Sequence, residues 1–510
     1  MTTLRLKAAI YPAIAAAVLL TGCRVGPKYH TPPATAQAPP VSYKESPTQF
    51  KDTDGWKVAD PQDAMLHGKW WEIYNDPELN ALEDQLNINN QNIKLYFQNF
   101  MAARAIVREA HAQLFPTVGF GPSYQRSRSS ANLKNSTGTG GSSLNAGSQS
   151  TLTSLPFDVS WEPDLWGRIR NTISQYRFEA QLSAADLENE RLSEQANLAL
   201  FFFELRGQDA LQDLYTATIA ADRSALEYAR ARYETGIGDQ LTLVEAQNTL
   251  QNAESQAANV GVARAQYEHA IAVLIGTNPS SFSVPARALN AKPPAIPIGM
   301  PSQLLERRPD IAASERAMAA ANAQIGIADA AFYPSLVLSA SGGVESSTFK
   351  HLFDWPSRFW SIGPSISETI YDAGLRRATV QQYTATYNAN VATYRETVLT
   401  AFQQVEDSLA AVRILSQQIL KQQEAEQSAE QFVKLETDRY RLGIDPYVNV
   451  VTAQTTLLSD QTTLTALRIQ AMTSSVQLIQ ALGGGWDRSQ LPTPSQVSAK
   501  PSRADTAIQR

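Results

Sequence analysis

The side chains best suited to catalysis or metal binding are scattered along this chain of 510 residues. Its five histidines are His30, His67, His111, His269 and His351. None of them stands in H-E-x-x-H or another metal-ligand spacing, and the sequence contains neither G-x-S-x-G nor a phosphate-binding loop. We therefore expect no enzyme activity, no metal site and no bound cofactor.

One residue does carry predictable chemistry, the single cysteine Cys23. It follows Arg5, Lys7 and an apolar run over 8–20, which is too short for a membrane span and is typical of a signal peptide covering residues 1–22. The junction "LLTGC" resembles a bacterial lipobox, which implies cleavage before Cys23 and acyl chains such as palmitate on that residue. Two or three chains are needed for a stable anchor. By the same resemblance to bacterial lipoproteins, Arg24 in place of an aspartate implies export to the outer membrane.

Charge and composition exclude two other classes of protein. The chain carries 43 basic and 49 acidic residues, for a net charge of −6, and has no dense run of lysine and arginine. Nucleic acid is therefore not an expected partner. With 43% hydrophobic and 18% charged residues, the chain is not globally disordered.

The spacing of proline predicts unusually long helices. No proline occurs between Asp164 and Asn278, or between Ser365 and Asp445. Helices over about 164–234 and 373–442 would each be roughly 105 Å long at about 1.5 Å per residue. In the second of these helices the apolar residues follow an eleven-residue repeat, which favours a bundle with little left-handed supercoil over a leucine zipper. Four short segments instead alternate with period two, over about 117–127, 152–162, 335–344 and 358–370, and include aromatic residues typical of transmembrane β-strands.

The chain is internally duplicated. "RYETGIGDQLTLVEAQNTL" and "RYRLGIDPYVNVVTAQTTL" align at an offset of 207 residues, whereas "LFP" and "FYP" align at 218. The predicted organisation is a tether over 23–69, repeats over 70–300 and 301–486, and a flexible tail over 487–510. Each repeat reads helix, strand, loop, strand, long helix, turn, return helix, with return helices over about 241–276 and 447–482. Four strands cannot close a barrel in lipid, so several chains must combine.

The segments "CRVGPKY" and "WWEIYNDPEL", the two "RY..GI" turns and the terminal "LGGGW" resemble the TolC-like outer-membrane efflux factors, in particular their lipoprotein branch. The resemblance implies an α+β membrane protein, a homotrimer with a twelve-stranded outer-membrane β-barrel above a long periplasmic α-helical barrel. It also implies a periplasmic adaptor (a membrane fusion protein) and an inner-membrane transporter of the resistance-nodulation-division class as partners. The expected function is an exit duct for drugs and other toxic small molecules.

The same resemblance gives the two turns a role at the periplasmic tip, where adaptor contact and opening by helix splaying are expected. The expected tip-turn residues are Gly236, Ile237, Gly238, Gly443, Ile444, Asp445 and Pro446. The candidate gate residues are Arg439, Tyr440, Asp239, Glu245, Asp445, Asn449 and Thr452. Arg439 and Tyr440 either hold the closed state against a neighbouring turn, or Arg439 interacts only with its own helix C-terminus.

Two alternatives remain open at the level of sequence. A structural lipoprotein would form no pore, which the four alternating segments disfavour. A duct for protein secretion is the second alternative. The lipobox favours drug-type efflux, but no residue of the predicted wall identifies the cargo.

Overall fold

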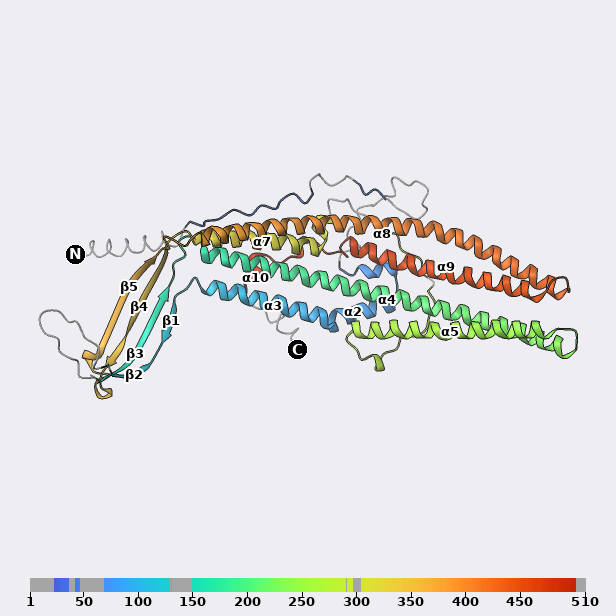
Figure 1. The fold of residues 1–510 in the computed structure, drawn as a ribbon, viewed down its shortest axis with the longest axis horizontal. Coiled ribbons are helices and arrows are strands. Elements are labelled where there is room, and N and C mark those ends of the chain that lie inside the picture. The colour runs from blue at the N-terminus through green and yellow to red at the C-terminus, as the bar shows by residue number, and fades with distance from the viewer. Residues whose placement is uncertain are drawn as a thin grey trace.

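The computed structural model describes residues 23–35, 42–45, 68–128, 130, 149–289, 291–296 and 304–500. The predicted signal peptide therefore lies outside the described residues, as do parts of the tether, of the β2–β3 loop and of the tail. The structure is elongated, with a β-sheet at one end and a bundle of long helices extending away from it (Figure 1). Among the helices of the described residues, none is both long enough and apolar enough to cross a bilayer.

Two helices determine the length of the molecule. Helix α4 (Arg168–Glu234) and helix α8 (Leu375–Arg441) each have 67 residues, which corresponds to about 100 Å. Each turns back into a 35-residue helix, α5 (Gln240–Leu274) and α9 (Tyr447–Ala481). Glycines with positive φ precede both long helices, at Gly167 and Gly374. The long helices therefore begin about two to four residues later than the sequence predicted.

Shorter helices complete the bundle on the side of the sheet. They are α2 (Pro77–Asn89), α3 (Gln91–Ala112), α6 (Leu304–Arg307) and α7 (Pro309–Ala330), with 3-10 turns η2 (Trp70–Tyr74) and η3 (Pro279–Ser281). Near the sheet, α3, α4, α7 and α8 lie side by side in that order, whereas farther away α5, α4, α9 and α8 are neighbours. Asp76 caps α2 by accepting hydrogen bonds from Glu78 N and Leu79 N, as its sequence context predicted.

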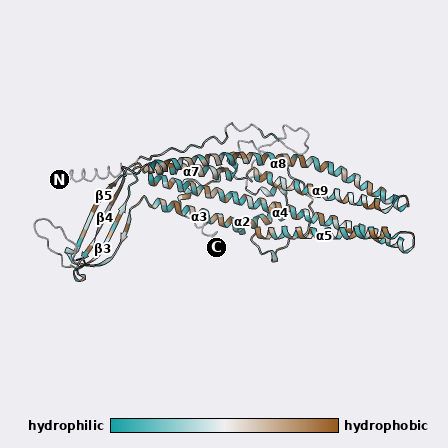
Figure 2. Ribbon diagram, viewed as in Figure 1, coloured by the Kyte–Doolittle hydropathy of each residue, from teal (hydrophilic) through white to brown (hydrophobic). Residues whose placement is uncertain are grey.

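The predicted apolar stripe of α8 is the packed face. Tyr394, Val398, Val405 and Leu409 on this stripe are buried in the main core, where Phe202 of α4 also lies. Hydrophilic and hydrophobic residues are interspersed along the long helices (Figure 2). Burial of one narrow face, with polar residues elsewhere, is the pattern expected of a bundle helix.

The sheet contains five strands, β1 (Thr117–Phe120), β2 (Ser123–Arg128), β3 (Gln149–Trp161), β4 (Ser335–Ser346) and β5 (Arg358–Ser367). The sequence predicted a single first strand, but Gly121 and Pro122 interrupt it. Proline lacks the N–H that would continue the ladder. Both β1 and β2 pair with β3 in one continuous antiparallel register, and the sheet order is β1/β2–β3–β4–β5. Among the described residues, no further strand pairs with the outer side of β1/β2 or of β5, so both sides are open.

The junctions between the returning helices and the next segment match in the two halves. Asn90 Nδ2 donates to Leu274 O at 2.9 Å, and Arg308 Nη1 donates to Ala481 O at 3.0 Å. These donors are 218 residues apart and the acceptors 207, the same offsets that relate the two halves of the sequence.

Two segments predicted to be loose are packed instead. In the predicted tail, η7 (Arg488–Gln490) is followed by α10 (Pro494–Ser498), which is closed by a capping box between Thr493 and Gln496. Val497 of α10 is fully buried against α3 and α4. In the predicted tether, Tyr43 is 3% exposed and belongs to the main core. Each of these segments is anchored by one apolar side chain that is buried in a pocket formed by other elements.

Candidate functional site

The turn between α4 and α5 is closed by backbone hydrogen bonds. Ile237 N donates to Arg232 O at 3.0 Å, and Gly238 N donates to the same oxygen at 2.9 Å. Gly236 has φ of 75°, the left-handed conformation that glycine adopts without strain. Asp239 caps α5 by accepting from Thr242 N at 2.9 Å, and these hydrogen bonds from Thr242 lower the pKa of Asp239.

The turn between α8 and α9 has the same left-handed glycine and one extra ion pair. Gly443 has φ of 74°, and Ile444 N donates to Arg439 O at 3.0 Å. Arg439 also binds the Asp445 carboxylate through Nε and, at 3.2 Å, through Nη2. Hydrogen bonding and charge from Arg439 hold the pKa of Asp445 below its usual value. Arg439 therefore stabilises the turn to which it belongs, by an ion pair within one chain.

Pro446 differs slightly from its predicted position. The sequence placed it in the first turn of the return helix, whereas the structure puts it at the N-cap of α9, with ψ of 154° and no side-chain cap. Proline at this position leaves no N–H unpaired and fixes the direction of the chain into α9.

Tyr440 faces the first hairpin and connects it to the second. The guanidinium of Arg232 lies 5.2 Å from the centre of the Tyr440 ring and 5.9 Å from that of Tyr228. The Tyr440 ring also lies edge-on to Tyr228 at 6.3 Å and tilted against Tyr447 at 5.2 Å. This group of Arg232, Tyr228, Tyr440 and Tyr447, called here the tip cluster, joins α4, α8 and α9.

A buried acid of α4, Asp222, lies close enough to Tyr447 of the tip cluster to act on it electrostatically. Asp222 is 4% exposed, and its Oδ2 has no hydrogen-bond partner in the structure. Burial raises the pKa of Asp222 to about 6. Burial, with further contributions from Asp222, Tyr440 and Glu245, raises the pKa of Tyr447 to about 12. One carboxyl group near the tip cluster, that of Asp222, therefore has a pKa well above the usual value for aspartate.

Within the described residues, the other predicted gate residues form no hydrogen bond with the tip cluster. Asn449 and Glu245 are half-buried. Thr452 is exposed, and its hydroxyl donates to Val448 O of its own helix at 2.8 Å. Asp239 and Asp445 each engage their own turn, whereas Asp222 is buried and its Oδ2 has no hydrogen-bond partner.

Both turns present apolar side chains to solvent. Ile237 is 72% exposed and Ile444 is 60% exposed, and these two residues occupy equivalent positions in the two hairpins. Leu241, Val244, Leu442 and Val448 are also exposed large hydrophobic residues. Clustered apolar residues at the end of an otherwise polar rod are typical of a protein-binding surface.

The strand register divides the sheet into two faces of different chemistry, since directly paired residues share a face. One face is mostly apolar and is called here the apolar face. Its central rows are Val118 and Phe120 of β1, Leu155, Phe157, Val159 and Trp161 of β3, Leu336, Leu338, Ala340 and Val344 of β4, and Trp360, Ile362, Pro364 and Ile366 of β5. Phe120 and Phe157 stack at 4.7 Å. Trp360, Ile362 and Ile366 are 72–77% exposed.

The opposite face, called here the serine face, is small and polar. It carries Ser123 and Ser127 of β2, Ser154, Asp158 and Ser160 of β3, Ser339, Ser341, Gly343 and Glu345 of β4, and Ser361, Gly363, Ser365 and Ser367 of β5. An apolar face on one side and a polar face on the other is the alternation of a membrane-spanning barrel wall. From Leu336 to Val344 the apolar face extends about 26 Å along the strand.

Cys23 is exposed, and its carbonyl oxygen accepts a hydrogen bond from Arg170 Nη2, near the start of α4, at 3.4 Å. The segment after it is held by Val25 N donating to Trp166 O at 3.1 Å and by Asn171 Nδ2 donating to Val25 O at 3.0 Å. Gly26, with φ of 105°, packs so closely on Gly326 of α7 that a Cβ would overlap the Gly326 backbone. The proposed lipid attachment point is thus fixed to the body of the protein.

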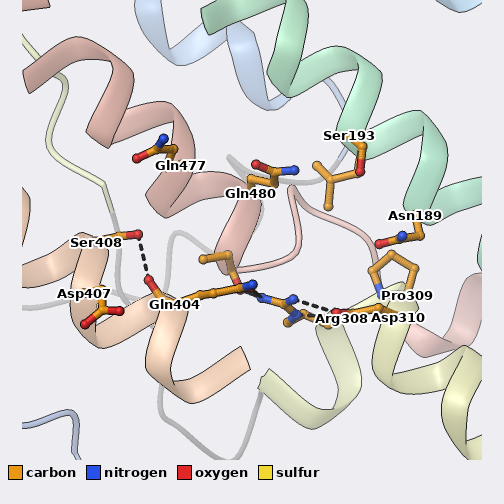
Figure 3. Close-up of a pocket in the computed structure, with 12 residues that line it drawn as sticks. Asn189, Ser193, Arg308, Pro309, Asp310, Gln404, Asp407, Ser408, Gln477 and Gln480 are labelled. Carbon is orange, nitrogen blue, oxygen red and sulfur yellow. Dashed lines mark hydrogen bonds and ion pairs between the residues drawn. The ribbon is translucent and has the colours of Figure 1, made fainter. Parts of the chain in front are cut away.

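A polar pocket of about 420 Å³ lies where α4, α7, α8 and α9 meet (Figure 3). Arg308 extends along it and donates to Asp310 Oδ2 at 2.6 Å, to Gln404 Oε1 at 2.9 Å and to Ala481 O. These bonds fasten the start of α7 to α8 and to the end of α9. The pocket is therefore part of a structural junction, and its arginine is occupied.

Sequence reasoning missed three members of the tip cluster. Arg232 and Tyr233 are the counterparts of Arg439 and Tyr440 at the 207-residue offset, so the duplication could have pointed to Arg232. Tyr228 and Tyr447 carry no such signal, because their counterparts are Leu435 and Gln240. Asp222 corresponds to Ala429, so its burial also could not be inferred from the repeat.

Comparison with known proteins agrees with this geometry. The sequence pattern of the family described as outer membrane efflux protein matches residues 82–277 and 300–484. The Pseudomonas putida protein TtgC, described as a toluene efflux pump outer membrane protein, is 32% identical over 476 residues, covering 92% of this chain and 94% of TtgC. Outer membrane protein OprJ of Pseudomonas aeruginosa is 29% identical over 485 residues, covering 93% of this chain and 95% of OprJ.

Solved structures give the same result. The outer-membrane channel OprN superimposes with a TM-score of 0.80 at 26% identity, covering 91% of this chain and all of OprN. The CmeC outer-membrane channel of Campylobacter jejuni shares the fold, with a TM-score of 0.83 and 23% identity, covering 95% of this chain and 99% of CmeC. From its sequence and its fold, the chain belongs to the outer membrane efflux protein family.

Proposed function

We propose that this protein is the outer-membrane exit duct of a tripartite efflux pump. It would receive toxic organic molecules, such as solvents and antibiotics, from an inner-membrane transporter of the resistance-nodulation-division class and a periplasmic adaptor. Relatives are described as components of toluene and antibiotic efflux pumps. Passage through such a duct needs no cofactor, and the outer membrane is its proposed location.

The observation that carries the proposal is the sheet with its apolar face and serine face, joined in one chain to helices about 100 Å long. The sheet is open at β1/β2 and at β5, and open edges are not tolerated in lipid. We propose a homotrimer, in which β1 and β2 of each copy count as one interrupted strand and the closed barrel has twelve strands. The helices would form the periplasmic tunnel.

The tip supports a gate and an adaptor surface. The exposed residues Ile237 and Ile444 are suited to adaptor contact, while the tip cluster holds the second hairpin against the first. Opening would separate these hairpins at the tip. Acylation of the exposed Cys23 would add a lipid anchor beside the barrel.

The two faces of one strand provide a matched test. Ile362→Asp places a charge on the apolar face, where a lipid-facing charge destabilises a barrel, by about 2–4 kcal/mol at mid-membrane for Arg or Lys and by less for Asp. Ser361→Asp places the same charge on the serine face. We expect the first variant to fail to insert as a trimer in planar bilayers and the second to insert with raised cation selectivity.

The proposal is wrong if purified wild-type trimers produce no conductance, or if the two variants behave alike. In cells lacking their own duct, the wild type should restore efflux of a fluorescent dye, and Ile362→Asp should not. Secretion of a protein without dye efflux would favour a secretion duct instead.

A further inference from the structure

Beyond its apolar rows, the apolar face ends in a group of cations. On β2, the residues that share this face are Tyr124, Arg126 and Arg128, which pair with odd-numbered residues of β3 as Phe120 does. On β5, Arg358 pairs with Val344 and follows directly beyond Trp360. Both positions lie at the end of the sheet far from the helices, next to the β4–β5 loop (Figure 1). We call this group, with Lys350 of that loop, the outer cationic rim.

Acidic residues of the sheet lie on the other face. Asp158 and Glu345 both belong to the serine face by register. Within the described residues, no carboxylate forms an ion pair with Arg126, Arg128 or Arg358, and Arg126 donates only to the Gln149 amide oxygen, at 3.1 Å. The acidic side chains of the sheet therefore lie on the serine face, and the arginines lie on the apolar face. The arginines of the outer cationic rim are thus available to an external anion.

Exposed aromatic side chains accompany these cations. The Arg358 guanidinium stacks on the Trp355 ring at 3.8 Å, and Trp355 itself is 76% exposed. Phe349 and Phe353 of the same loop are 75% and 72% exposed. Aromatic side chains beside cations, directly beyond an apolar band, are suited to the interface between acyl chains and headgroups.

We propose that the outer cationic rim binds the phosphate groups of anionic lipids in the outer leaflet, while their acyl chains cover the apolar face. This proposal rests on the proposed function, which turns the apolar face toward the membrane. Arginine binds phosphate through a planar fork of donors, and stacking of Arg358 on Trp355 orients that fork in advance. A lipid headgroup is favoured over free phosphate because the rim continues the apolar rows without a gap.

Closure of the proposed barrel would complete the site. Arg358 lies on the open strand β5, and Arg126 and Arg128 lie on the opposite open strand, β2. When β5 of one copy meets β1/β2 of the next, the cations of both copies gather at the outer end of one seam. The lipid phosphate would then be held at the joint between two protomers.

The test compares two variants that each lose three positive charges. The rim variant is Arg126→Gln/Arg128→Gln/Arg358→Gln. The control variant is Arg230→Gln/Arg377→Gln/Lys434→Gln, whose residues are exposed on the helices. Bound lipid is counted by native mass spectrometry of the full-length trimer with bisphosphorylated lipid A, with its dephosphorylated form, and with inorganic phosphate as competitor.

A cation near a membrane surface contributes about fivefold to binding of an anionic lipid, so the rim variant should bind lipid A on the order of 100-fold more weakly. The control variant should bind lipid A as tightly as the wild type does. The dephosphorylated lipid should bind poorly to both of these proteins. Millimolar inorganic phosphate should displace little lipid. Equal binding by rim and control variants, or equal binding of the two lipids by the wild type, would overturn the proposal.

Single-channel conductance separates this proposal from the proposed function. Trimers of the rim variant should still form pores of wild-type conductance, because the substituted arginines lie outside the serine face. Wild-type conductance without lipid selectivity would reject only the proposal that the rim binds lipid. Absence of pores in the wild type would reject the proposed duct function.

Discussion

Replacement of Tyr440 by alanine should loosen the tip without disturbing either turn. The ring is the only part of the second hairpin that stacks with Arg232 in the described structure, and it also contacts Tyr228. The backbone bonds that close the second turn, from Gly443 N to Tyr440 O and from Ile444 N to Arg439 O, involve no side chain of Tyr440. The change therefore removes the contacts between hairpins, together with the Tyr440–Tyr447 contact inside the second hairpin, and leaves the backbone bonds of the turn in place.

The lost contacts set the size of the effect. A cation–π pair at an accessible site contributes about 0.5–1 kcal/mol, and an edge-to-face aromatic pair contributes about 0.5–1.5 kcal/mol beyond burial. Their sum, about 1–2.5 kcal/mol per chain, would raise the open-to-closed ratio roughly 5- to 70-fold. Tyr440→Phe keeps the ring and should change this ratio little.

Single-channel recording in planar bilayers measures the effect as a higher conductance or a larger fraction of open time. Arg439→Ala is the matched control, because the observed partner of Arg439 is Asp445 of its own turn. Replacing Arg439 and Tyr440 together should therefore raise conductance no further than Tyr440→Ala alone. The reasoning is refuted if Tyr440→Ala conducts as the wild type does, or if Arg439→Ala opens the channel equally. In a double-mutant cycle, Arg232→Ala and Tyr440→Ala should also be non-additive.

Three further substitutions test other parts of the structure. Because burial raises the pKa of Asp222 to about 6, above about 3.9 in the unfolded chain, the folded state binds the extra proton. Stability should therefore fall as the pH rises from about 4 to 6, and thermal unfolding of Asp222→Asn should lack this loss. Gly26→Ala should release the segment after Cys23 from α7, which limited proteolysis would detect as faster cleavage there. Cys23→Ser should abolish incorporation of labelled palmitate, and unchanged labelling would reject acylation at Cys23.

The long helices and the sheet could be predicted because their signals are repetitive. Absence of proline over 115 residues of one repeat, and period-two alternation in segments such as Trp360 to Ile366, each involve many side chains that act alike. A single exception has little influence on such a pattern. Pro122 is an example, since it interrupts the first strand without shifting its register.

The docking of the termini could not be predicted in the same way. Val497 and Tyr43 are isolated apolar residues in segments rich in Pro, Ser and Thr, and each is buried only because another element offers a pocket. The capping box of Thr493 and Gln496 was readable from the sequence, but a helix of five residues is not stable on its own.

The tip cluster could be predicted from the sequence only in part. The two turns could be located from glycine and from the duplication, whereas the stacking of Arg232 on Tyr440 depends on how α4 and α8 are placed beside one another. Two equivalent arginines, Arg232 and Arg439, thus have different partners. Equivalent positions in a repeat share a backbone conformation, but their side chains depend on neighbours that the repeat does not copy.

The serine face has a consequence for the speed of transport. Its hydroxyl groups and glycines offer short, neutral contacts, and on β5 only Phe359 interrupts them. A solute that passes along the proposed barrel interior would meet few groups strong enough to retain it, so its dwell time would be short. The flux of the whole pump would then be limited upstream, at the step that loads the duct, and chemically unrelated molecules would leave at similar rates.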